Sequence, residues 1–72
     1  MTAETLDKRL LRAHAEGDKA ALVTLYQEAA EAAPDETGRW FYMTHAYVFA
    51  LEVAHPEASR LRDRLVAAGR EG

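Results

Sequence analysis

Single glycines and prolines along an alanine-rich chain constrain the fold of this protein more than any other feature of its sequence. They stand at Gly17, Pro34, Gly38, Pro56 and Gly69. Glycine tolerates the left-handed backbone conformation that closes a helix, and proline pushes the residue before it out of the helical region. Alanine, which is frequent between these positions, has the highest helix propensity of all residues. The sequence therefore predicts an all-α protein.

The spacing of apolar residues predicts three to four short antiparallel helices within one small domain, 1–72. Asp18 is placed to cap the second helix, and Pro56 is placed as the first residue of the fourth. The expected helices cover residues 3–15, 18–32, 36 or 38 to 54, and 56–69. Their apolar stripes are Leu6, Leu10 and Ala13 in the first helix, Leu22, Leu25, Tyr26, Ala29 and Ala33 in the second, and Ala58, Leu61 and Leu65 in the fourth.

The third predicted helix is apolar on two sides. A helix with this pattern is normally enclosed between other elements or touches a partner. One side carries Trp40, Met43, Thr44, Tyr47, Leu51 and Ala54, and we expect it to face the core through Trp40, Met43, Tyr47 and Leu51. The second side carries Phe41, His45, Val48, Phe49 and Glu52.

Two local patterns resemble the tetratricopeptide (TPR) repeat, a helix–turn–helix unit. Gly17-Asp18 followed by Tyr26-x2-Ala29-x4-Pro34 is similar to the second half of one unit, and Trp40-x2-Met43-Thr44-x2-Tyr47 is similar to the first helix of the next. Leu22 and Thr44 stand where the family prefers alanine and glycine. The outer segments fit poorly, so about half of the chain carries the resemblance. It implies one to two degenerate units, stacked as helical hairpins; a small three- or four-helix bundle is the alternative.

The same resemblance implies a binding function without catalysis, because TPR-like proteins bind peptides and partner proteins along the first helix of each hairpin. Carried over position by position, the partner-binding surface holds Asp7, Leu11, His14, Phe41, His45, Val48, Phe49 and Glu52. Phe41 and Phe49 are expected to be its anchors, since a contiguous exposed apolar patch usually marks an interface. Packing of the first or fourth helix over this patch is the simpler alternative.

Self-association is a second possible role for the third helix. Stacked repeats need about three copies or a cap before their core is closed, and this chain has at most two. A homodimer formed through the same face would complete the core and bury the same phenylalanines.

Composition argues against several other classes of protein. The net charge of −3 and the scattered basic residues disfavour nucleic acid binding. The longest apolar stretch, residues 40–54, is too short to span a bilayer, and the charged N-terminal segment lacks the apolar run of a signal peptide. With no cysteine present, disulfides and thiolate metal sites are excluded. We therefore expect a small cytoplasmic protein that binds neither nucleic acid nor membrane.

Catalytic and metal-binding motifs are equally sparse. The chain has no phosphate-binding loop and no nucleophile motif, so we expect neither enzymatic activity nor a cofactor. His14 and His45 could face one groove and form a two-histidine metal or pH-sensitive site. Glu52-x2-His55 has the spacing of half a di-iron carboxylate site, which a dimer could complete. Surface histidines that contact water are the simpler interpretation of both.

Overall fold

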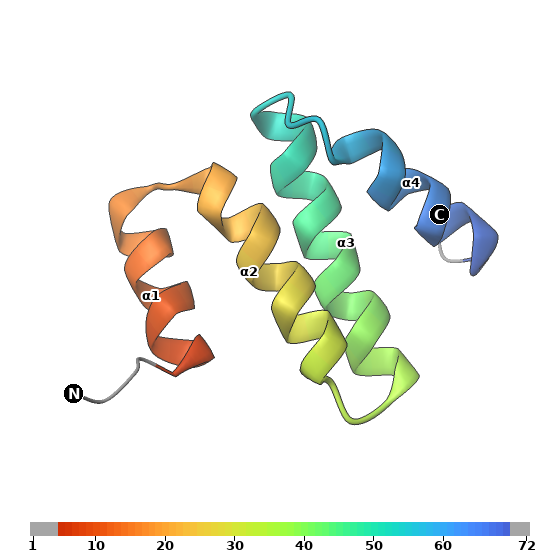
Figure 1. Ribbon diagram of the computed structural model, residues 1–72, viewed down its shortest axis with the longest axis horizontal. Coiled ribbons are helices and arrows are strands. Elements are labelled where there is room, and N and C mark those ends of the chain that lie inside the picture. The colour runs from red at the N-terminus through yellow and green to blue at the C-terminus, as the bar shows by residue number, and fades with distance from the viewer. Residues whose placement is uncertain (1–4, 70–72) are drawn as a thin grey trace.

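The computed structural model describes residues 5–69, and all regular secondary structure in that range is helical. Successive helices run in opposite directions through short connections (Figure 1). They are α1 (Leu6–Glu16), α2 (Lys19–Ala32), α3 (Glu36–Glu52) and α4 (Ala58–Ala67). The predicted all-α fold with short antiparallel helices is confirmed. Residues 3 and 4 of the first predicted helix lie outside the described range.

Local signals fix the ends of the first three helices. The carboxylate of Asp18 accepts a hydrogen bond from the amide of Ala21 at 3.1 Å, as predicted, and that of Asp35 accepts one from the amide of Gly38 at 2.7 Å. Each carboxylate satisfies an amide that has no partner within its helix. Gly17 closes α1 with a φ of 65°, a left-handed conformation that a residue without Cβ adopts at little cost.

The connection between α3 and α4 differs from the prediction. Helix α4 begins at Ala58, and Pro56 lies in the turn before it, where the amide of Glu57 donates a hydrogen bond to His55 Nδ1 at 3.0 Å. Ala54 was predicted on the core side of the third helix. It instead lies beyond the end of α3 with a φ of 52°, a left-handed conformation that alanine rarely adopts.

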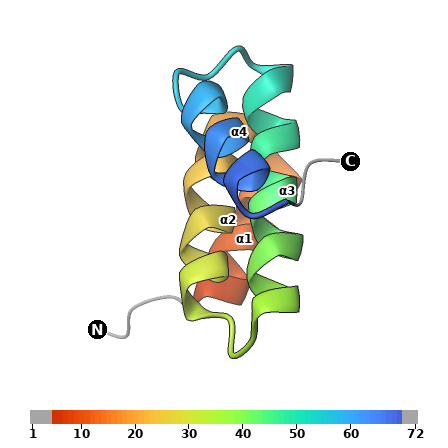
Figure 2. The same cartoon turned by 90° about the vertical axis from the view of Figure 1, so that its right-hand side faces the viewer.

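The helices pack as a row, each against its neighbours in sequence. Among the described residues, backbones approach closely between α1 and α2, α2 and α3, and α3 and α4, and between no other pair. Figure 1 shows this row, with α1 at one end and α4 at the other, and the molecule measures 41 × 29 × 16 Å. Seen from the α4 side in Figure 2, α2 and α3 lie next to each other behind α4. Helix α3 therefore occupies the interior of the row.

Two clusters of buried side chains hold this row together. The larger one joins α2, α3 and α4 and consists of Val23, Ala30, Met43, Ala46, Ala50, Leu61 and Leu65. The smaller one joins α1 and α2 and consists of Ala13, Leu22 and Leu25. Tyr26 and Phe49 pack against both clusters, so they link the two halves of the core.

The core side of α3 was predicted only in part. Met43 is buried as expected, and Trp40 and Tyr47 are half-buried against the larger cluster. The prediction was wrong for Leu51, which is 55% exposed, and Thr44 on the same side is also exposed. The fully buried positions of α3 also include two alanines, Ala46 and Ala50. Because α2 and α4 both approach α3, its small residues occupy the tightest contacts and its larger apolar residues flank them.

Candidate functional site

Tyr26 of α2 is the centre of a group of aromatic side chains drawn from three helices. Its ring stacks on that of Phe49, with centroids 5.7 Å apart and planes inclined by 11°, and on that of Tyr42 at 6.1 Å. The His45 ring lies 5.2 Å away. The Tyr26 hydroxyl is hydrogen-bonded to Nε2 of His14 at 2.8 Å. Three of the predicted site residues, His14, His45 and Phe49, therefore converge on one tyrosine.

Side chains of α1 and α3 meet over α2 at this point. The ring centroids of His14 and Phe49 are 5.9 Å apart in an edge-on arrangement, although the backbones of their two helices do not approach closely. The predicted proximity of α1 and α3 is thus a contact between side chains. Because Phe49 is half-buried and packs on both core clusters, its role as an exposed anchor is not supported. At Phe49 the structure agrees with the alternative named above, in which the first helix packs over part of the apolar patch, because His14 of α1 contacts this ring.

The more exposed part of the patch runs along α3. Phe41 is 57% exposed and Val48 is 48% exposed, and Thr44 and His45 lie between them. The Phe41 ring packs against those of His45, at 4.4 Å, and Tyr42, at 5.5 Å. We refer to Phe41, Thr44, His45 and Val48 together as the α3 face.

Two open pockets adjoin the α3 face. One, of about 180 Å³, is lined by Thr44, His45, Val48 and Phe49. The other, of about 430 Å³, lies toward the beginning of the helix and is lined by Thr37, Trp40, Phe41, Thr44 and His45. Both are formed mainly by aromatic, aliphatic and threonine side chains. Such a lining suits an apolar side chain better than a charged group.

Hydrogen bonds fix the orientation of the polar groups on this face. His45 Nδ1 lies 2.8 Å from the carbonyl oxygen of Phe41, and the Thr44 hydroxyl donates to the carbonyl of Trp40 at 2.8 Å. Since a carbonyl oxygen only accepts, the first contact places a proton on Nδ1 of His45. Both polar side chains are thus turned back onto α3, which leaves apolar groups as its main exposed surface.

The remaining predicted site residues are less closely connected to this group. Asp7 and Leu11 lie on the exposed surface of α1, and Leu11 is 69% exposed. The carboxylate of Glu52 pairs with Lys19 Nζ of α2 at 3.6 Å, so it links α3 to α2. Tyr26 was predicted only as a core residue. Its hydroxyl could have indicated a contact with a polar site residue such as His14, because a tyrosine at a packing position normally needs a polar partner.

The environment of Tyr26 alters its acidity. Partial burial, and secondarily the nearby Tyr42, raise the pKa of the Tyr26 hydroxyl above its usual value of 10.0. Burial has this effect because it disfavours the charged phenolate. The hydroxyl therefore stays protonated at neutral pH, in the state in which it can hydrogen-bond to His14.

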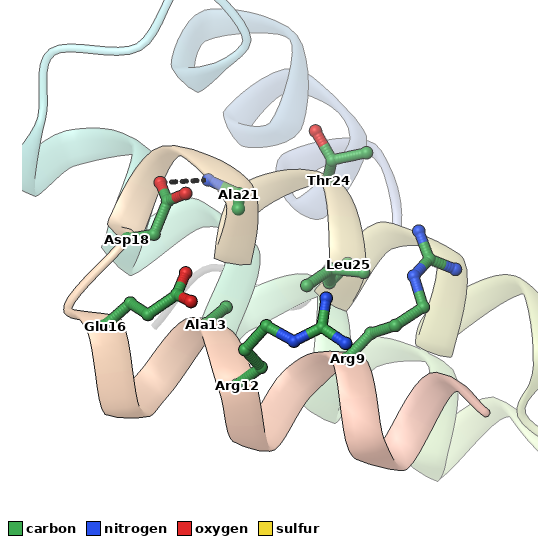
Figure 3. A pocket seen from close by; sticks show the side chains of 8 residues that line it. All are labelled: Arg9, Arg12, Ala13, Glu16, Asp18, Ala21, Thr24 and Leu25. Atoms are coloured by element: carbon green, nitrogen blue, oxygen red, sulfur yellow. Dashed lines mark hydrogen bonds between the residues drawn. The ribbon is translucent and has the colours of Figure 1, made fainter. Parts of the chain in front are cut away.

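A separate groove of about 300 Å³ lies between α1 and α2 (Figure 3). Its floor contains Ala13 and Leu25, and charged side chains of both signs surround it. Arg9 forms a two-point ion pair with Glu28, both distances being 3.1 Å, and Asp18 caps α2. The balanced charges and internal contacts give no indication of a ligand.

The sequence raised two possible metal sites, and neither has three ligands together within the described residues of one chain. No group of three or more histidine, aspartate or glutamate side chains there is placed to hold a metal ion. His14 and His45 lie near Tyr26, but Nε2 of His14 contacts its hydroxyl. Nδ1 of His55 accepts a hydrogen bond from the Glu57 amide.

In residues 5–69 no helix has the length and apolar character needed to cross a membrane.

Comparisons with protein-family models, with curated proteins and with solved structures found no match to this chain. The α3 face is therefore interpreted from its own geometry.

Proposed function

We propose that this protein is a non-catalytic interaction module that binds a segment of a partner protein on the α3 face. The observation that carries the proposal is the exposure of Phe41 and Val48 beside two pockets with apolar linings. A phenylalanine that is more than half exposed on a helix without a covering element gains free energy when a partner removes it from water. Aromatic residues next to a pocket are the usual energetic centres of interfaces.

The geometry favours an amphipathic helix or an extended peptide as the ligand. Phe41 and Val48 are seven residues apart, two turns along one side of α3. A ligand lying along α3 would place successive apolar side chains in the two pockets, as in other helix-in-groove complexes. Phe41 is the proposed anchor, whereas Phe49 supports the face from below through its stacking on Tyr26.

The TPR-like architecture is part of this proposal. It is motivated by helical hairpins that follow one another along the row, as hairpins do in stacked repeats, and by the contribution of Tyr26, Ala29 and Met43 to packing. Thr44 departs from the pattern, because it is exposed and does not sit at a close helix contact. The cytoplasmic setting expected from the sequence belongs to the same proposal.

Self-association is the second candidate function. It is favoured by exposed apolar residues beyond the α3 face: Leu51 on α3, Leu11 on α1 and Val66 on α4 are 55%, 69% and 50% exposed. A row of helices whose ends each have one neighbour offers surfaces that a second copy can cover.

Light scattering coupled to gel filtration separates the two candidates. A monomer with a melting temperature independent of concentration supports binding of a different protein; a dimer whose melting temperature rises with concentration supports self-association. Affinity capture is then compared for wild type, Phe41→Asp and Val66→Asp. The last is the matched control, because it places the same charge on an exposed apolar site of α4. Loss of a captured partner with Phe41→Asp alone supports the α3 face, and equal retention by both variants contradicts it.

A further inference from the structure

The side of α3 opposite to Phe41 borders a second, very different pocket. Arg39 and Phe41 are two residues apart, so they point about 200° away from each other around the helix. The pocket measures about 370 Å³ and is enclosed by α2, α3 and α4. The fully buried residues Ala30 and Met43 form its floor. Four charged residues surround it: Glu31, Arg39, Arg60 and Arg64.

Tertiary structure brings the three arginines together. Arg60 and Arg64 are four residues apart and therefore share one side of α4, and docking of α4 on α3 places Arg39 beside them. Three guanidinium groups and one carboxylate line the pocket, and Glu57 pairs with Arg60, so these five groups together carry about +1 in a chain whose net charge is −3. This accumulation of like charge is unfavourable unless an anion offsets it.

Intramolecular contacts offset little of this charge. Arg60 pairs with Glu57 at 3.4 Å, but its side chain is 64% exposed, and exposed pairs of this kind contribute little to stability. Neither Arg39 nor Arg64 makes an ion pair with another residue in the described part of the chain, and Glu31 lies farther than 4.0 Å from all three guanidinium groups. Most of the donors of Arg39 and Arg64 are thus available to a ligand.

We propose that this arginine pocket binds the phosphate group of a phosphate monoester. The planar guanidinium group donates two parallel hydrogen bonds to phosphate oxygens, and three such groups from two helices can surround one tetrahedral anion. A phosphate monoester carries about −1.5 to −2 at neutral pH, and its three acceptor oxygens can each receive a hydrogen bond from one of the three arginines; a single carboxylate offers only two oxygens. The bound group would connect α3 to α4.

The test is a titration of the intact chain with inorganic phosphate, followed by NMR of backbone amides and arginine Nε–H groups. Sodium chloride at equal ionic strength controls for simple screening of the arginines. We expect saturable shifts confined to Arg39, Arg60, Arg64 and their neighbours. Because Arg64→Gln removes charge-assisted hydrogen bonds to the phosphate, it should weaken binding about tenfold or more. Arg62→Gln is the matched control: it removes the same charge from the same helix, outside the pocket, and should leave the dissociation constant within about twofold.

Two further comparisons complete the test. Glycerol phosphate and a phosphoserine peptide distinguish a metabolite from a modified protein as the source of the group, and saturable binding of either at the pocket supports the site. Phe41→Asp should leave phosphate binding unchanged, so this inference and the proposed function can fail independently. Non-saturable shifts, shifts that chloride reproduces, or equal weakening by Arg64→Gln and Arg62→Gln would overturn the proposal. Far-UV circular dichroism confirms that each variant is folded.

Discussion

Truncation of two apolar residues of α3 tests the packing of this helix directly. The sequence pattern places Met43 and Leu51 on one core side of the helix, whereas the structure separates them. Met43 is 1% exposed and Leu51 is 55% exposed. Met43→Ala and Leu51→Ala remove similar volumes, and both introduce the best helix former. Any difference in stability between the two variants therefore reports tertiary burial.

The expected magnitudes follow from these exposures. Met43 belongs to the cluster that joins α2, α3 and α4, so its truncation loses apolar burial and leaves a cavity within this cluster. Core truncations of this type cost about 2–5 kcal/mol, and we expect about 3 kcal/mol for Met43→Ala. More than half of the Leu51 surface already contacts solvent, so Leu51→Ala should cost about 0.5 kcal/mol.

Such a loss is large for a domain of this size. A core this small supplies about 3–5 kcal/mol of stability in total, so Met43→Ala should leave the protein close to its unfolding midpoint at room temperature. In a thermal melt followed by circular dichroism, the melting temperature should fall by more than about 12 °C for Met43→Ala and by about 2–4 °C for Leu51→Ala. Urea titrations give the free energies of unfolding. Costs that agree to within about 0.5 kcal/mol would refute the packing of α3 described above.

Two further predictions concern single side chains. Tyr26→Phe removes the hydroxyl that contacts His14 at 2.8 Å and should cost about 1 kcal/mol at neutral pH. Since the pKa of Tyr26 is raised in the folded state, wild-type stability should fall as the pH rises above 10.0, and the difference from Tyr26→Phe should shrink; a pH-independent difference in urea unfolding contradicts this. Ala54→Gly should raise the melting temperature, because Ala54 has a φ of 52° and glycine relieves a strain of about 1 kcal/mol. A lower melting temperature for this variant argues against the left-handed conformation.

Helix α3 has a different chemical character on each exposed side because of its interior position in the row. The α3 face around Phe41 is mainly apolar, and the arginine pocket beside Met43 is cationic. Neighbouring helices differ between the two sides. Helices α2 and α4 frame the pocket, whereas the α3 face is contacted by the Tyr26 ring of α2 at His45, and His14 of α1 contacts the adjacent Phe49. The two proposed sites therefore use separate surfaces of one helix.

Local signals in the sequence determined the helices. Gly17 ends α1 and Asp18 begins α2 through contacts within a few residues, so their effect does not depend on the rest of the fold. Two predicted helix starts were too early: Thr5 is the extended N-cap of α1, and α4 begins at Ala58. The error at Pro56 arose because proline is tolerated both in a first helical turn and in the turn before it. Apolar periodicity also predicted that α3 is apolar on two sides and that Phe41 lies on the side away from Met43.

Tertiary structure alone decided which side of α3 is buried. Periodicity favoured the large residues, such as Leu51, but the structure fully buries Ala46 and Ala50 in the cluster that joins α3 to α2 and α4. Close approach of helices requires small side chains at the contact, a condition that depends on the neighbours and not on α3 itself. Contacts between distant segments likewise placed Phe49 on Tyr26 and Arg39 beside Arg64. The sequence determined the helices and their caps, and the packing of those helices decided which of their residues are left to bind.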